Sequence, residues 1–177
     1  MSLLTLHLLG SPVLRQRSPE VEAFDAELKK FIDELYETME AAKGVGLAAN
    51  QVGVARRVAV VDAEGQRFAM VNPRIVRAEG KSTAEEGCLS IPDVYGDVTR
   101  PASVTLEALD RDGKPFRLEA DGLVARAIQH EIDHLDGILF LDHLGALRRA
   151  MLLKKFRKEY AGKGFLKEVH EVEPETA

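Results

Sequence analysis

The sequence predicts an α+β fold, and three observations carry that prediction. Apolar residues recur at helical spacing in an early segment, extended segments joined by hairpin-like connections occupy the middle of the chain, and a second apolar helical segment follows around residue 130. A doubly wound parallel sheet would need regular alternation of strands and helices, which is missing. We therefore expect a group of strands between an early and a later helix.

The early helix is predicted to begin at Ser18-Pro19-Glu20, because serine caps helices and proline suits a first turn. It should end near Lys43-Gly44, since glycine favours the C-terminal cap. A helix that binds a partner is the alternative to one that faces the core. Between the two ends, apolar residues spaced three and four apart form one face: Val21, Phe24, Leu28, Phe31, Ile32, Leu35 and Met39.

Extended structure is predicted where short runs are rich in β-branched and aromatic residues. Asp112-Gly113 offers a tight hairpin turn between two such runs. Helical structure is predicted from about Asp121 to just before Gly137, and again over 146–160, where Leu, Ala, Met, Lys and Arg dominate. The extended runs are 58–61, 68–71, 104–109 and 115–118.

The segment 129–134 reads Gln-His-Glu-Ile-Asp-His and contains a His-Glu-x-x-His motif. Residues four apart on a helix stack on one face, so His130 and His134 can aim ring nitrogens at one metal ion. Glu131 is then placed to handle protons on a metal-bound water. The motif therefore predicts metal-assisted hydrolysis.

Two histidines at this spacing can also be ordinary surface or core residues, and the surrounding helix argues against that alternative. Apolar residues cover most of its circumference, which is typical of a buried helix. Buried histidines and a glutamate need partners, and a metal supplies one. The apolar positions are Leu123, Val124, Ala127, Ile128, Ile132 and Leu135.

The composition is that of an ordinary globular protein. The 177 residues are 45% hydrophobic and 30% charged, and the net charge of −5 gives no reason to expect specific nucleic-acid recognition. No apolar run approaches the roughly 20 residues of a membrane span. The single cysteine, Cys88, cannot form an internal disulfide, and the apolar N-terminal stretch lacks a basic leader and a cleavage site. We therefore expect a cytoplasmic protein.

Cys88 and Gln51 are the other residues with useful chemistry. A lone cysteine can be an inert buried residue, but two histidines leave a catalytic metal one protein ligand short of three, and a thiolate would fill that place. Gln51 ends the stretch 44–51, which could be a flexible turn and lacks the lysine of a nucleotide-binding loop. Its uncharged amide can donate to a developing oxyanion.

Three stretches taken together resemble the peptide deformylases. They read Gly-Val-Gly-Leu-Ala-Ala-Asn-Gln at 44–51, Glu-Gly-Cys-Leu-Ser at 86–90 and Gln-His-Glu-Ile-Asp-His at 129–134. All three motifs are intact, in the family's order and at fitting separations. The likeness also extends to the first helix and to the Leu-Phe-Leu-Asp-His segment at 139–143, so that it covers most of the chain except the tail.

This resemblance implies antiparallel β-sheets surrounding a central helix that carries the two histidines, followed by a C-terminal helix. It implies a metal held by Cys88, His130 and His134 with water in the fourth place. The ion is expected to be Fe(II), and Zn, Ni or Co can also occupy such a site. The implied reaction removes the N-formyl group from the N-terminal methionine of newly synthesised proteins and releases formate.

The resemblance also assigns roles near the metal. Glu131 would accept a proton from water and deliver it to the departing amine, while the Gln51 amide and the Leu89 backbone N–H would share the oxyanion charge with the metal. The substrates would be N-formylmethionyl peptides and nascent chains. Five residues are expected to edge the substrate site, although packing roles are an alternative for Val45, Ile91 and Tyr95. These are Val45, Gly46, Gly87, Ile91 and Tyr95.

Two other hypotheses also use the two histidines. A zinc endopeptidase shares the two histidines and the glutamate, but it usually takes a third histidine or glutamate in place of a cysteine. A non-enzymatic metal-binding or redox-sensing module would normally close the metal site with a fourth protein ligand. Formate release distinguishes the deformylase from both.

The C-terminal part of the chain is expected to be peripheral. Residues 1–165 are predicted to form a single catalytic domain, and residues 166–177 an acidic, flexible tail in which His170 is solvated. The basic run 154–158 could make a transient contact with the ribosome or could be a solvated helix face.

Overall fold

The computed structural model of the protein describes residues 3–171. Within that range it contains three α-helices, α1 (Ala26–Ala41), α2 (Gly122–Leu135) and α3 (Ala146–Tyr160). Three short 3₁₀ helices accompany them: η1 (Pro12–Arg15), η2 (Ala49–Val52) and η3 (Phe140–His143). The strands are β1 (Leu6–His7), β2 (Gly46–Ala48), β3 (Val58–Ala63), β4 (Gln66–Glu79), β5 (Ser82–Cys88), β6 (Ile91–Arg100), β7 (Ser103–Leu109), β8 (Pro115–Asp121) and β9 (Leu166–Lys167).

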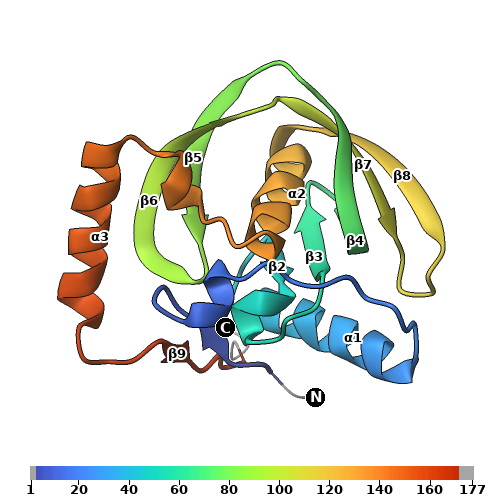
Figure 1. The fold of residues 1–177 in the computed structure, drawn as a ribbon, viewed down its shortest axis with the longest axis horizontal. Helices are drawn as coiled ribbons and strands as arrows, with labels where there is room; N and C mark the ends of the chain where they lie inside the picture. The colour runs from blue at the N-terminus through green and yellow to red at the C-terminus, as the bar shows by residue number, and fades with distance from the viewer. Residues whose placement is uncertain (1–2, 172–177) are drawn as a thin grey trace, which may run out of the picture.

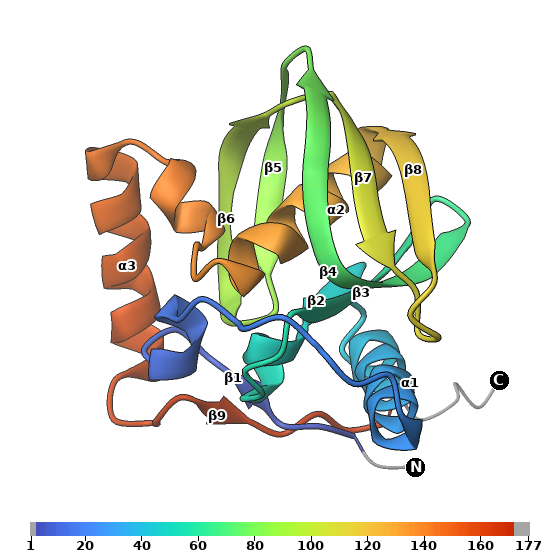
Figure 2. The ribbon, with the colours of Figure 1, turned by 45° about the vertical axis from the view of Figure 1, so that its right-hand side comes forward.

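All strand pairs in this part of the chain are antiparallel. The largest sheet has the order β2-β3-β4-β7-β8, and β5-β6 and β1-β9 form two-stranded sheets. The strands curve around α2, which lies at the centre of the molecule (Figures 1 and 2). This arrangement confirms the predicted α+β class, with antiparallel sheets around the motif-bearing helix and a C-terminal helix after it.

The central position of α2 follows from its apolar circumference. Val124, Ile128 and Leu135 are at most 1% exposed and pack with side chains of β3, β4 and β7 in one core cluster. The helix ends where Gly137 adopts a φ of +77°, as expected for a glycine after a helix. Leu123 departs from the predicted buried face: it is 40% exposed.

The predicted start of α1 was wrong. The helix begins after Asp25, whose side chain accepts a hydrogen bond from the Leu28 N–H at 2.9 Å. The segment before it is not helical: the Ser18 N–H is bonded to the Leu135 carbonyl, and the Pro19 carbonyl accepts from Arg57. Long-range backbone pairing therefore outweighed a local sequence pattern that also suits a helix start.

The hairpin β5–β6 was not among the predicted extended runs. Cys88 ends β5 and Ile91 begins β6, so the turn is confined to the two residues between them. Alternating burial along β6, with Val94, Gly96 and Val98 inside, is the period-two pattern that could have revealed this strand.

The chain after α3 returns to the N-terminal strand. Helix α3 packs through Leu152 and Phe156, and β9 then pairs with β1 (Figure 2). The predicted tail boundary at 165 falls just before β9, and residues 172–177 of that tail lie outside the described residues. Among residues 3–171, no helix has the length and apolarity needed to cross a membrane.

Candidate metal centre and substrate cleft

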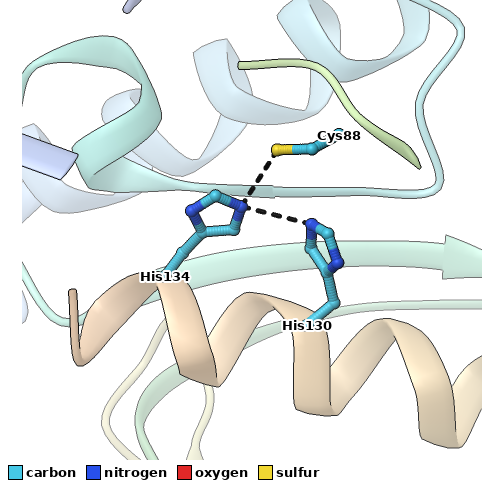
Figure 3. Close-up of side chains that lie close together, drawn as sticks. All are labelled: Cys88, His130 and His134. Atoms are coloured by element: carbon cyan, nitrogen blue, oxygen red, sulfur yellow. Dashed lines mark hydrogen bonds between the residues drawn. The ribbon is translucent and has the colours of Figure 1, made fainter. Parts of the chain in front are cut away.

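Three donor atoms from separate parts of the chain converge at one point. Cys88 comes from the end of β5, and His130 and His134 come from successive turns of α2 (Figure 3). The Nε2 atom of His134 lies 3.2 Å from the Cys88 Sγ and 3.2 Å from the His130 Nε2. The three donors all lie within 4.8 Å of one another.

These separations suit a single divalent ion. Metal–nitrogen bonds of about 2.0–2.1 Å at tetrahedral angles place two nitrogens about 3.3 Å apart. The Nε2 atoms of His130 and His134 lie 3.2 Å apart, which matches that value. Without a metal, two neutral rings in this position can form only one N–H···N hydrogen bond. One thiolate and two imidazoles leave a coordination position open for catalysis. The donor set therefore fits a catalytic metal.

Glu86 sets the orientation of His130. The His130 Nδ1 donates to the Glu86 Oε1 at 2.9 Å, which leaves the Nε2 lone pair free for a metal. Arg100 donates to both oxygens of Glu86 at 2.6 and 2.9 Å, and Arg126 donates at 2.5 Å. Burial would raise the pKa of Glu86, but its hydrogen bonds from His130 and Arg100 hold that pKa well below its usual range. The carboxylate is therefore charged and fully occupied.

The network continues along the surface of α2. Arg100 also donates to Asp133 at 2.8 Å, and His143 Nε2 lies 2.7 Å from the same carboxylate oxygen. Sequence reasoning missed both Glu86 and Arg126. The sequence offered one signal for Arg126: it is a charged residue in an otherwise apolar helix, and it lies one turn before His130.

Glu131 lies against the backbone of β2. A Cβ atom at Gly46 would come within 2.5 Å of the Glu131 Oε2, so only glycine leaves room for the carboxylate. The side chain is buried, and its Oε1 has no hydrogen-bond partner within the described residues. Burial raises the pKa of Glu131 to about 7, while the neighbouring His130 opposes the rise. A carboxyl group with that pKa can exchange protons near neutral pH.

The predicted loop 44–51 forms β2 and η2 and places Gln51 beside the donors. The Gln51 Oε1 accepts from the Ala48 N–H at 2.9 Å, so the NH₂ group is directed toward Ser90 Oγ at 3.2 Å and Cys88 Sγ at 3.7 Å. Asn50, to which the sequence assigned no role, donates its side-chain N–H to the His134 backbone carbonyl. The loop is thereby attached to the metal helix.

A cleft of about 680 Å³ is lined by two of the three donors, Cys88 and His130, and by Glu131. Leu89 and the five predicted substrate residues all line it, and among these Val45 is 43% and Tyr95 is 52% exposed. Ile91 also packs in a core cluster with Val94, so its side chain serves the fold as well as the cleft wall. Sequence reasoning did not identify the other lining residues near the metal, Leu123, Arg126 and Ala127.

A cysteine sulfur, two helical imidazoles and a buried glutamate beside a cleft define a metal-dependent hydrolase of the His-Glu-x-x-His class. Comparisons with known proteins specify the family within that class. Residues 4–150 match the family described as polypeptide deformylase. The chain belongs to the polypeptide deformylase family.

Individual relatives agree with this assignment. The chain is 53% identical over 164 residues to the peptide deformylase of Brucella suis, an alignment that covers 89% of this chain and 94% of the relative. A solved peptide deformylase from Legionella pneumophila is 43% identical with a TM-score of 0.86, covering 89% of this chain and 95% of that one. One from Ehrlichia chaffeensis, in complex with actinonin, is 36% identical with a TM-score of 0.86, covering 91% and 99%.

The activity expected from the three motifs is therefore confirmed at the level of the family. Members of this family remove N-formyl groups from nascent peptides with a divalent metal, and this chain is such a hydrolase. Of the three hypotheses drawn from the sequence, the family assignment favours the deformylase over the endopeptidase and the non-enzymatic module.

Proposed function

We propose that Cys88, His130 and His134 hold one divalent metal ion and that Glu131, Gln51 and Leu89 perform the deformylation of N-formylmethionyl chains. The observation that carries the proposal is the buried Glu131 carboxyl group next to three converging donors. When bound, the metal supplies a Lewis acid that polarises the formyl oxygen and activates water. The remaining steps belong to residues of this chain.

Glu131 is the proton carrier of the reaction. It accepts a proton from the water that attacks the formyl carbon, and it returns that proton to the nitrogen when the C–N bond breaks. Formate and a free amino terminus result. The same carboxyl group can take part in both transfers because they happen in sequence.

Gln51 and Leu89 stabilise the oxyanion that forms on the formyl oxygen. The Ala48 N–H fixes the Gln51 carbonyl, so the amide NH₂ group is held on the side of Cys88, where it lies 3.7 Å from the sulfur. The Leu89 backbone N–H, adjacent to Cys88, is the second proposed donor. Removing one such donor typically costs about 3 kcal/mol in the barrier.

The substrate lies in the cleft next to these groups. Val45, Gly46, Gly87, Ile91 and Tyr95 form its proposed edge, with the peptide extended beside the backbone near Val45 and Gly87. The Val45 carbonyl already accepts from the Asp62 N–H at 2.9 Å, which holds this edge in place.

We propose Fe(II) as the resident ion on the basis of the family resemblance. Zn, Ni or Co are proposed as substitutes, because thiolate and imidazole donors accept all four. The proposed location is the cytoplasm, where formylated nascent chains emerge. We also propose the ribosome as a transient partner, contacted through the basic run 154–158 of α3. Its residues Lys154, Arg157 and Lys158 are exposed, whereas Phe156 faces the core.

The decisive experiment measures formate release from formyl-Met-Ala-Ala by protein purified without air, with metal analysis of the same sample. Stoichiometric formate and about one metal ion per chain are expected. Cleavage of an internal peptide bond without formate would support the endopeptidase instead. A metal with four protein ligands and no exchangeable position would support the non-enzymatic module.

A further inference from the structure

The segment after α3 is attached to the body of the molecule by backbone and apolar contacts. Leu6 of β1 pairs with Lys167 of β9, and the Leu8 N–H donates to the Phe165 carbonyl at 2.6 Å. Val169 packs against the core cluster formed by α1, β2 and β3. These contacts hold the segment in a defined place beside the N-terminal strand (Figure 1).

This place makes the segment a wall of the active-site cleft. Residues 167–170 line the same cleft as His130 and Glu131, together with Leu6 and the end of α1 at 41–43. The cleft thus reaches from the metal donors to the C-terminal segment. The cleft volume of about 680 Å³ falls in the range of about 300–1,000 Å³ that holds whole drug-sized ligands. The cleft is therefore larger than a formyl group and one side chain require.

The chemistry of the two ends differs. At the metal end the donors are largely buried, and the partly buried Leu89 supplies apolar surface. At the other end Lys167, Glu168 and His170 are exposed and polar. A formylated chain enters with its amino terminus at the metal, so the residues after the methionine leave through the polar part.

We propose that Lys167, Glu168 and His170 form a subsite that selects formylated chains by the charge of the residues following the methionine. This inference rests on the proposed deformylase function and adds a specificity element to it. Charged groups at such an exposed wall act on substrate affinity, because they are remote from the reacting bond and contribute equally to ground and transition states.

The test compares three substrates, formyl-Met-Ala followed by two lysines, two glutamates or two alanines, at low ionic strength. Glu168→Lys reverses one charge of the wall. We expect it to raise the kcat/KM ratio of the acidic over the basic peptide about threefold to tenfold, mainly through KM. Lys167→Glu should shift the ratio in the opposite direction, and about 0.5 M salt should suppress both effects.

Glu159→Lys is the matched control, because it makes the same charge change on the exposed end of α3, outside the cleft. An unchanged ratio in both wall variants, or an equal shift in Glu159→Lys, would overturn the subsite. Absence of formate from the alanine peptide with wild-type protein would instead overturn the proposed function, and the subsite with it.

Discussion

At the residue scale, the geometry of the metal donors depends on the hydrogen-bond partners that orient the histidine rings, such as Glu86 at His130. The four-residue spacing predicted that His130 and His134 share a face of one helix, and the structure brings both together with Cys88. The role of Glu86 could not be predicted in the same way. Its partners Arg100 and Arg126 come from β6 and α2, and only the fold brings them to one carboxylate.

The roles of Glu131 and Cys88 can be separated by substitution. Glu131→Gln should lower kcat by about 10²–10⁴-fold and retain the metal, because in the proposed mechanism the side chain transfers protons and is not a donor to the ion. Cys88→Ala should lower metal content itself. Formate kinetics and elemental analysis of the two variants measure these effects. Metal loss from Glu131→Gln, or full metal content in Cys88→Ala, would contradict the assignment.

Glu86→Gln tests the support of His130. We expect metal affinity to fall about 10–100-fold, since the imidazole loses its charged acceptor. Because Arg100 and Arg126 would lose a buried counter-charge, the free energy of unfolding should fall by about 3–5 kcal/mol. Competition with a metal chelator and urea unfolding measure the two quantities. Glu85→Gln, on the same strand but exposed, is the control and should retain both properties.

The proposed ligation of the metal by Cys88 predicts sensitivity to air. An Fe(II) preparation should lose activity on aeration, because iron can pass to Fe(III) and Cys88 can oxidise, whereas a Ni preparation should survive longer. Activity and free-thiol content, followed over time for both preparations, check this prediction. Equal decay rates would contradict it.

At the element scale, sequence patterns located α2 and α3 but not every strand or helix end. The helix predicted over 146–160 coincides with α3, and the helix predicted from about Asp121 to just before Gly137 matches α2. Both helix predictions rest on residue types and spacings within one short segment. The start of α1 was missed because long-range backbone pairing occupies the Ser18 region. The hairpin β5–β6 was missed because only β6 alternates in burial, whereas β5 shows no such alternation.

The true start of α1 makes Asp25 a measurable cap. Asp25→Ala should reduce the free energy of unfolding by about 1 kcal/mol, because the Leu28 N–H loses its acceptor. Asp25→Ser keeps an acceptor at the same position and should retain most of the stability. Urea unfolding of the two variants measures the difference. Equal losses would show that the cap does not stabilise this helix.

At the scale of the whole molecule, Tyr36 connects α1 to the sheet. The Arg67 guanidinium lies 4.1 Å from the centre of its ring, and burial raises the pKa of Tyr36 to about 12. Folding therefore favours the protonated phenol. The stabilisation is complete below the unfolded pKa of about 10 and is lost as pH rises through about 12.

Tyr36→Phe should remove this pH dependence. The wild type should lose stability relative to the variant as pH rises from about 10 to about 12, since the phenolate forms more readily in the unfolded chain than in the partly buried folded site. Chemical unfolding at several pH values measures this loss, and phenolate absorbance follows the titration itself. Parallel stability curves for the two proteins would contradict the prediction.

The sequence by itself determined the family, the α+β class and the residues that meet at the metal centre. Intact motifs and helical spacing are local properties, and local properties can be read along one chain. Only the tertiary structure decided that the Glu86 carboxylate accepts hydrogen bonds from His130, Arg100 and Arg126. It also decided that residues 167–170 line the active-site cleft. Those relations join residues 14 to 44 positions apart around Glu86, and the ends of the chain through β1 and β9. They arise from packing, which no local pattern encodes.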